Sequence, residues 1–387
     1  MRKLTKILTG VATVAAALAL AVPAANADPI NGKSQPVVPT YYDIVGVGSN
    51  TTQYVVDQIA FNYDASGDHS TTHPYIYSWD ATNPYTGATG DTIATKADCN
   101  TKALEIARPN GSGAGLTALD DNTKNSKGYY CVDYARSSSG RSSTSPKFGP
   151  GGVVYVPFAK DAVTWATDKT TNAPASLTLT QLYDIYTCKV TNWDKLGGKN
   201  AEIQPYLPPT SSGTRSFFLK EIGVTSVSTG CVPASHQTVE ENEGINSVFK
   251  NNPNILVPYS IGSWLSQEYR SAAIGKNPTS GQNKFGHDEN GYLYLNDVNG
   301  TAPYVNAGTA KSPDYVINSS FSKSGTTYPL IRVLYNIVRY YGTSANYYMA
   351  PREEEFFAPK GYLCSTAAQT QIKNYGFLVD ALCGHGD

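Results

Sequence analysis

The sequence predicts a two-lobed α/β protein with a ligand cleft between its lobes. Small polar loops repeatedly follow strand-like segments and precede helix-like ones. Two apolar, strand-like segments, residues 151–158 and 255–262, bracket a middle block of the chain. If both strands cross between the lobes, the block forms one lobe and the flanking parts form the other. Ligands of open α/β sheets bind at the carboxyl ends of strands, so the small polar loops are the expected binding elements.

The expected boundaries place a signal peptide at 1–27, a discontinuous first lobe at 28–157 and 262–387, and a second lobe at 158–261. The first residues are basic, an apolar run follows at 7–22, and Ala25-Asn26-Ala27 has the small-x-small pattern of a cleavage site. The first cysteine is Cys99, so no residue near the cleavage site can carry a lipid. We therefore expect a secreted, non-lipidated protein.

Charge argues against a nucleic-acid or anionic-membrane partner. With Arg2, Lys3 and Lys6 removed, the 30 Lys plus Arg fall to 27 against 31 Asp plus Glu, a net charge of −4. Any site for an anion must then be local. We expect a monomer without a cofactor.

Six cysteines in an exported chain predict three disulfides. Six cysteines allow 15 connectivities, which sequence alone does not distinguish. The nearest-neighbour pairing is Cys99–Cys131, Cys188–Cys231 and Cys364–Cys383. A metal cluster is the alternative, and it is disfavoured because no C-x-x-C spacing occurs.

Two segments near the C-terminus have patterns of their own. Residues 329–341 place apolar side chains at helical spacing, which predicts a buried helix. Residues 353–355 are three consecutive glutamates, which predict a solvated face. The other elements expected are strands at 42–47 and 129–134, helices at 53–61, 178–188, 263–269 and 366–376, and loops with hairpins at 275–318.

Residues 207–219 carry the strongest local signal for a site. Ser212 can cap a helix, Gly213 removes a Cβ from the tightest point, and Thr214 and Arg215 add a hydroxyl and a guanidinium. A helix start offers unpaired N–H groups and a partial positive charge. The segment therefore predicts an oxyanion cradle, with a serine-capped surface helix as the alternative.

Three further loops share this small polar character, at 48–52, 110–115 and 135–142. Common turns are the alternative interpretation of each loop, and their repetition after strands favours a shared site. Asp64, Asp68, His69 and His73 also lie close together in the sequence, but polar loops collect such residues freely, and we expect no metal there.

The chain resembles the phosphate-binding subunits of ABC importers, within the type II periplasmic-binding-protein fold. The 182–193 segment, LYDIYTCKVTNW, is similar to that family's L-x-D-I-Y-x-G-K-I-x-x-W pattern, and SGTR at 212–215 is similar to its S-G-T loop. The order and spacing of the segments carry the resemblance. The other matching segments are 44–50, 110–115, 132–138, 152–156 and 260–262.

The resemblance implies a ligand such as phosphate, and it implies ABC importer membrane subunits as partners. Hydroxyls and backbone N–H groups would donate to the anion, and Arg136 is a candidate charge partner. A handful of such bonds supports a site of about micromolar affinity. The implied ligand residues are Ser49, Asn50, Thr51, Ser112, Ser137, Ser138, Ser212, Gly213, Thr214 and Arg215.

Two positions depart from the family pattern. Ser138 stands where the family has an Asp that accepts the proton of phosphate, and Pro208 stands where it has an Arg. Sulfate, a phosphate ester or another polar ligand therefore stays open beside phosphate.

Two other functional classes compete with a solute-binding protein. An exported surface protein could keep the fold without a transport role. A secreted hydrolase is disfavoured because neither G-x-S-x-G nor H-E-x-x-H occurs and no histidine neighbours suggest a triad.

Overall fold

The computed structural model describes residues 28–29, 37–121, 123–274, 290–318, 330–342 and 349–387. A nine-stranded mixed sheet forms its centre, with β10 and β15 pairing beside the main path. The signal-peptide segment 1–27 lies outside the described residues. In spatial order the main path runs β2 (Ile76–Ser78), β1 (Ile44–Gly48), β5 (Tyr134–Ser137), β14 (Ile331–Arg339), β6 (Val153–Asp168), β9 (Ile255–Ser260) and β8 (Gln204–Pro205).

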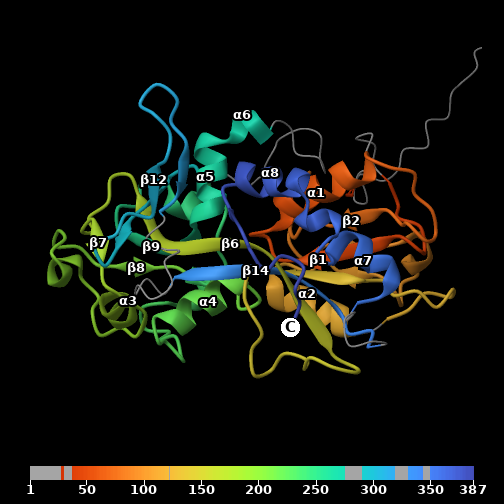
Figure 1. The fold of residues 1–387 in the computed structure, drawn as a ribbon. Helices are drawn as coiled ribbons and strands as arrows, with labels where there is room; N and C mark the ends of the chain where they lie inside the picture. Colours follow the sequence, from red (N-terminus) through yellow and green to blue (C-terminus); the bar gives the residue numbers. More distant parts are fainter. Residues whose placement is uncertain (1–27, 30–36, 122, 275–289, 319–329, 343–348) are drawn as a thin grey trace, which may run out of the picture.

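The 16-residue strand β6 lies between β14 and β9, and it contains most of the 151–158 segment that is expected to cross between the lobes (Figure 1). Its first part pairs antiparallel with β14, from Val153 to Ala162. Its second part pairs with β9, from Val163 to Ala166. The sequence-based strand ended too early because Lys160 and Asp161 interrupt the apolar run. Both side chains form ion pairs in the structure, which is how β6 tolerates them.

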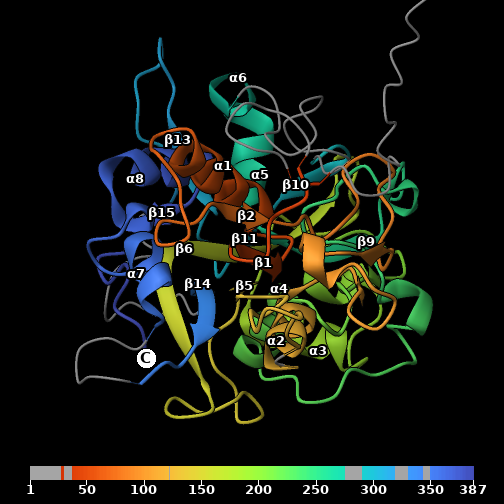
Figure 2. The same cartoon turned by 90° about the vertical axis from the view of Figure 1, so that its right-hand side faces the viewer.

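Helices cover both faces of the sheet, as the two views show (Figures 1 and 2). One face carries α1 (Gln53–Asp64), α5 (Ile261–Tyr269) and α8 (Thr366–Asn374), and the other carries α2 (Ser112–Asp120), α3 (Leu179–Tyr186) and α4 (Gly213–Glu221). The smaller elements are β3 (Thr92–Ile93), β4 (Ile106–Ala107), β7 (Ser176–Leu177), β10 (Leu293–Leu295), β11 (Asp297–Val298), β12 (Tyr304–Asn306), β13 (Tyr315–Ile317), β15 (Leu378–Val379), α6 (Ser271–Ile274) and α7 (Pro351–Phe357).

Separate apolar cores define two lobes. In the first lobe, α1, α7 and α8 pack on one side of the sheet around Ile59 and Phe356, and Trp79 and Leu119 lie in a core on the other side. In the second lobe, α3 and α4 pack around Trp165 and Phe218. Helix α5 packs with β9 in a further core. The two-lobed α/β fold expected from the sequence is confirmed.

The exact lobe boundaries at 157/158 and 261/262 stay a prediction. Two short strands from after residue 262 belong with the second lobe by pairing. Leu293–Leu295 pairs with the end of β6, and Asp297–Val298 pairs with β7. We therefore propose that this part of the chain returns to the second lobe before β14.

The helix expected at 329–341 is wrong, because Ile331–Arg339 is strand β14. It lies between β5 and β6, and its first residues alternate between partly buried and buried, as expected for a strand. Its apolar residues occupy both odd and even positions, which produced helical spacing in the sequence. The strand expected at 129–134 is also displaced, since β5 begins at Tyr134. The hairpin expected in 275–318 is present as β12 and β13, while 275–289 lies outside the described residues.

The solvated face expected at 353–355 is wrong for its first residue. Glu353 is buried, and only Glu355 is exposed. Burial raises the pKa of Glu353 to about 7, against the opposing effect of Arg352. Three consecutive glutamates predicted a solvent-exposed face, but helix α7 exposes only one of the three fully.

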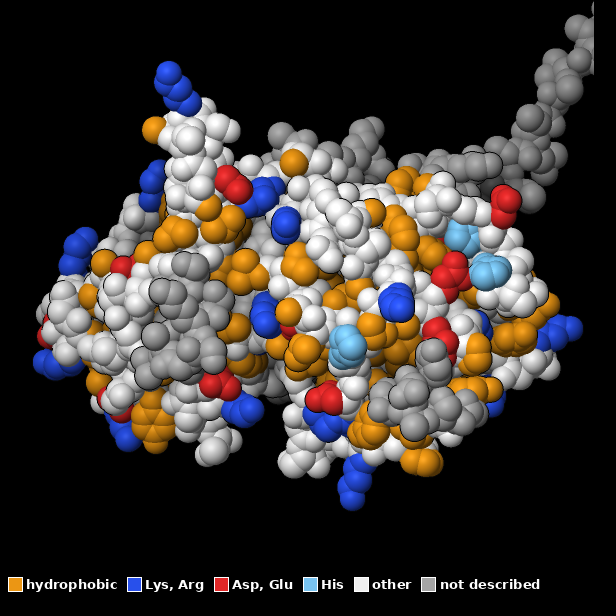
Figure 3. Space-filling view, in the orientation of Figure 1, with side chains coloured by type: hydrophobic (Ala, Val, Ile, Leu, Met, Phe, Trp, Pro, Cys, Tyr) orange, Lys and Arg blue, Asp and Glu red, His pale blue; other side chains and the backbone are white. Residues whose placement is uncertain are grey.

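All three expected disulfides are present, Cys99–Cys131, Cys188–Cys231 and Cys364–Cys383. On the face drawn in Figure 3, charged side chains of both signs are interspersed rather than gathered into one patch. Within the described ranges, no helix combines the length and apolar character needed to span a bilayer.

Candidate functional site

Three helices begin at one place between the lobes. The loop after β1 leads into α1, Gly111 precedes α2, and Ser212 precedes α4. The loops of the two lobes touch there, since Gly113 N donates to the carbonyl of Ser211 at 2.9 Å. Helix N-termini offer N–H groups and a partial positive charge to an anion. We call this place the cradle, defined by Asn50, Thr51, Ser112, Ser138, Ser212, Gly213 and Thr214.

The start of α4 is built as the sequence predicts. Ser212 is the N-cap, and its Oγ accepts from Arg215 N at 3.2 Å. Gly213 is required by its neighbours, because a Cβ there would lie 2.3 Å from Ser112 Oγ and 2.6 Å from Ser138 Oγ. Its backbone therefore packs directly against two hydroxyls of the first lobe.

Serine hydroxyls from the loops at 110–115 and 135–142 meet beside Gly213. Ser112 Oγ lies 3.3 Å from Ser138 Oγ, and it accepts from Ser138 N at 2.9 Å. Both residues are buried. The pair places polar atoms against the α4 N-terminus, as expected for a shared site.

Threonine hydroxyls from the two lobes meet on the other side of the cradle. Thr51 Oγ1 and Thr214 Oγ1 lie 3.1 Å apart. Asn50 contributes its side-chain amide, whose Oδ1 accepts from Thr51 N at 3.0 Å. Residues far apart in sequence thus present hydroxyl and amide donors to the same space.

A carboxylate of the protein itself occupies that space. Glu241 is fully buried, and its Oε1 accepts from Thr51 Oγ1 at 2.8 Å and from Thr214 Oγ1 at 3.0 Å. Its Oε2 accepts from Ser212 Oγ at 3.0 Å and from Asn50 Nδ2 at 3.4 Å. Four residues expected to hold an anion therefore all donate to one carboxylate. The preceding Glu240 accepts from Asn50 and from Asn110 at 2.7 Å.

The guanidinium of Arg332, which sequence reasoning missed, contacts the cradle. Its Nη1 donates to Thr214 Oγ1 at 2.7 Å and to the carbonyl of Ser138 at 3.1 Å. Asp161 of β6 holds the guanidinium, with Nη2 to Oδ2 at 2.7 Å. Arg332 lies on β14, so the incorrect helix assignment concealed it. A period-two pattern of Arg332, Leu334, Asn336 and Val338 facing one side would have been the signal.

Two expected arginines have partners outside the cradle. Arg136 donates to the carbonyls of Ser49 and Trp79 and to Ser78 Oγ. It therefore stabilises the 48–52 loop. The Arg215 guanidinium donates to the carbonyl of Pro208 and to Gln237 Oε1.

Two expected serines contribute no hydroxyl to the cradle contacts. Ser137 Oγ donates to the carbonyl of Ser139 at 2.7 Å. Ser49 Oγ is buried and has no hydrogen-bond partner in the part of the chain that the structure describes.

Comparison with known proteins identifies the family. A sequence model of the PBP superfamily domain matches residues 70–350, well over half of the 387 residues. The chain belongs to the PBP superfamily. The phosphate-binding protein PstS of Bacillus subtilis (strain 168) is 31% identical over 88 residues, covering 23% of this chain and 27% of that protein. That match therefore spans about a quarter of each chain.

Two solved structures share the fold of this chain. An ABC-type phosphate transport receptor from Vibrio cholerae has a TM-score of 0.53 and 19% identity, over 87% of this chain and 100% of that one. A putative phosphate ABC transporter substrate-binding protein with bound phosphate, from Clostridium perfringens, has a TM-score of 0.52 and 16% identity, over 87% and 99%. The expected family resemblance is confirmed.

In this PBP superfamily protein a groove of about 700 Å³ lies beside the cradle. It shares Ser112 and Gly213 with the cradle, and Phe217 and Lys220 of α4 line its second-lobe side. The groove brings solvent to the edge of the buried donors. It leaves room next to the cradle for a group larger than an oxyanion.

The histidines and aspartates of the 63–96 region have other roles. Asp64 Oδ1 accepts from Ile76 N, His73 pairs with Glu355, and His69 stacks on Tyr75. Among the residues described, no group of three or more His, Cys, Asp or Glu side chains is arranged to hold a metal ion.

Proposed function

We propose that this chain is a secreted solute-binding protein whose interlobe cradle binds phosphate or a related oxyanion, including the oxyanion of a phosphorylated solute. The observation that carries the proposal is the convergence of Asn50, Thr51, Ser212 and Thr214 on one carboxylate. The Glu241 carboxylate stands in for ligand oxygens, since each of its oxygens accepts from two donors. A phosphate group offers the same kind of acceptor.

Charge and shape support this ligand class. The Arg332 guanidinium donates to Thr214 Oγ1 and so places positive charge beside the cradle. The N-termini of α1, α2 and α4 add partial positive charge. Each hydrogen bond to a charged acceptor contributes about 1.5–3 kcal/mol. The adjoining groove would take the remainder of a phosphorylated solute. In this role the chain would deliver its ligand to ABC importer membrane subunits.

Calorimetry on protein stripped of ligand by unfolding and refolding tests the proposal. Inorganic phosphate, sulfate and a phosphate ester are titrated separately into the native sequence. We expect saturable heat with at least one of them at a stoichiometry near one. The absence of heat with all three would contradict the proposal.

A second candidate is an exported surface protein that keeps the fold without transporting a solute. The observation in its favour is the cradle filled by Glu241, because a protein without a ligand has no need to keep the cradle empty. Mass identification of small molecules released from the purified native protein distinguishes the two. A stoichiometric oxyanion favours transport, and its absence favours the surface protein.

A further inference from the structure

Glu241 connects the two lobes through the cradle. Asn50 and Thr51 follow β1 in the first lobe, whereas Ser212 and Thr214 begin α4 in the second. All four donate to its carboxylate, at 2.8–3.4 Å. The adjacent Glu240 accepts from Asn50 and Asn110, which both belong to the first lobe. Two adjacent glutamates of one segment thus join the lobes.

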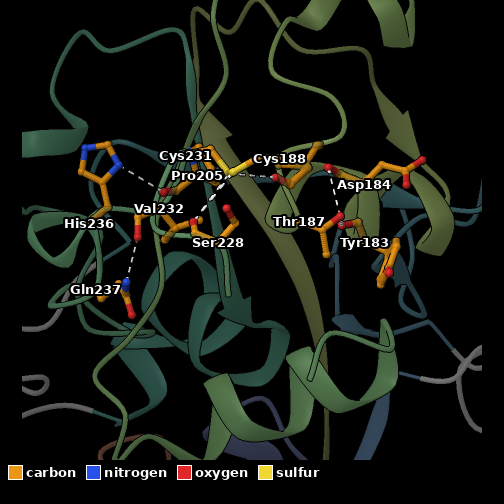
Figure 4. Close-up of a disulfide and its surroundings, with 11 residues drawn as sticks. Tyr183, Asp184, Thr187, Cys188, Pro205, Ser228, Cys231, Val232, His236 and Gln237 are labelled. Carbon is orange, nitrogen blue, oxygen red and sulfur yellow. Dashed lines mark hydrogen bonds between the residues drawn. A yellow bond between two sulfur atoms is a disulfide. The ribbon is translucent and has the colours of Figure 1, made fainter. Parts of the chain in front are cut away.

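The segment that carries these glutamates is held at both ends. At its start the Cys188–Cys231 disulfide fixes it to the end of α3, and Gln237 Nε2 donates to the carbonyl of Val232 at 2.8 Å (Figure 4). At its end Asn242 donates to the carbonyl of Asn50 at 3.3 Å and accepts from Gln267 Nε2 at 2.7 Å. The position of Glu241 is therefore set by the fold on both sides.

We propose that Glu241 is a tethered anion that occupies the oxyanion position and ties the lobes together in the absence of ligand. A free oxyanion must displace the carboxylate to bind. The displacement step rests on the proposed function, whereas the tie between lobes does not. When the carboxylate is removed, the hydroxyls of Thr51, Ser212 and Thr214 lose this shared acceptor, whereas Asn50 still donates to Glu240. Water that enters between the lobes can replace the lost acceptor.

The tie also lowers the affinity for a free anion. A ligand can bind only those molecules in which Glu241 has left the oxyanion position. Its apparent dissociation constant therefore equals the intrinsic constant divided by the fraction of such molecules. If Glu241 leaves the cradle less than about a tenth of the time, its removal strengthens binding at least tenfold. The proposal thus predicts opposite effects for Glu241 and for the hydroxyls around it.

Small-angle X-ray scattering without ligand tests the tie directly. The variants are Glu241→Ala and the volume-preserving Glu241→Gln, both checked for folding by circular dichroism. Glu243→Gln is the matched control, because Glu243 lies two residues away on the same segment and is less buried. We expect a larger radius of gyration for both Glu241 variants and no change for the control. An unchanged radius in the Glu241 variants would overturn the tie.

Calorimetry with inorganic phosphate then tests the displacement. We expect Glu241→Ala to bind at least tenfold more tightly than the native protein. Equal or weaker binding would overturn the displacement step, because Glu241 would then be neutral or would itself help to hold the ligand. Binding by the variant alone would support the tie and contradict the proposed function of the native protein. No binding by either protein would contradict the proposed function, while the scattering result would still decide the tie.

Discussion

Thr51 Oγ1 and Thr214 Oγ1 lie 3.1 Å apart across the boundary between the lobes, although 163 residues separate them in the chain. Each hydroxyl donates to Glu241. Thr214 also accepts from Arg332, so the pair links both lobes to a guanidinium. This contact is the centre of the candidate site, and most of the predictions below concern groups that converge on it.

Removing the Thr214 hydroxyl should weaken oxyanion binding. Thr214→Val keeps the shape of the side chain and removes one donor, so we expect the phosphate affinity to fall about tenfold or more. Calorimetry on ligand-stripped protein measures the change. Thr117→Val is the control, since Thr117 lies exposed on α2 and its hydroxyl donates to the carbonyl of Gly113. Equal affinities for the native protein and Thr214→Val would place the ligand elsewhere.

Neutralising Arg332 should also weaken binding, provided that its partner is neutralised with it. Arg332→Gln alone would leave Asp161 as a buried carboxylate without its cation, so the test uses Arg332→Gln together with Asp161→Asn. We expect at least a tenfold loss of phosphate affinity, because the guanidinium polarises Thr214 and adds positive charge.

Arg215→Gln is the comparison for this prediction. Its guanidinium contacts Pro208 and Gln237 rather than the cradle hydroxyls, so we expect a smaller loss of affinity. The same titrations measure both variants. A larger effect of Arg215 than of the Arg332–Asp161 pair would refute the assignment of Arg332 as the cation of the site.

The sequence predicted where α4 begins because the signals for a helix start are local. A serine cap, a glycine at the point of closest approach and hydroxyls after strands depend on neighbours in the chain, and Ser212, Gly213 and Thr214 lie where expected. Glu241 and Arg332 were missed because their roles depend on tertiary contacts. Glu241 belongs to a polar stretch typical of a solvated loop, and Arg332 lies in a strand whose apolar residues occupy both faces and so imitate helical spacing.

Stability should depend on pH through Glu353. Burial raises its pKa from 4.5 to about 7, so the folded state holds a proton that the unfolded state has released. Glu353 therefore adds up to about 3 kcal/mol to the free energy of unfolding below about pH 4.5. This stabilisation is lost as the pH rises through about 7. We expect Glu353→Gln to reduce the loss of stability between pH 5 and 8, measured by urea unfolding. Glu355→Gln is the control, because Glu355 is exposed on the same helix, and this variant should lose stability with pH as the native protein does. An unchanged pH profile for Glu353→Gln would contradict the role of Glu353.

The Cys188–Cys231 disulfide should stabilise both the fold and the segment that carries Glu241. It closes a loop with a sequence separation of 43, against 19 for Cys364–Cys383. Loop-closure entropy gives about 4 and about 3 kcal/mol for the two disulfides. Urea unfolding of the paired Cys→Ser variants measures these losses.

Hydrogen exchange separates the local effect from the global one. Loss of Cys188–Cys231 should increase exchange at residues 232–243, beyond the increase that its global destabilisation causes. Loss of Cys364–Cys383 should not single out this segment. Uniformly faster exchange in both variants would show that the first disulfide does not position Glu241.

The central claim is that an oxyanion binds where Glu241 lies, between Thr51 and Thr214. A crystal structure of ligand-stripped protein grown with inorganic phosphate tests it most directly. We expect phosphate within hydrogen-bond distance of both threonine hydroxyls, with the Glu241 carboxylate turned out of the cradle. Glu241 still in contact with both hydroxyls at saturating phosphate would contradict the claim.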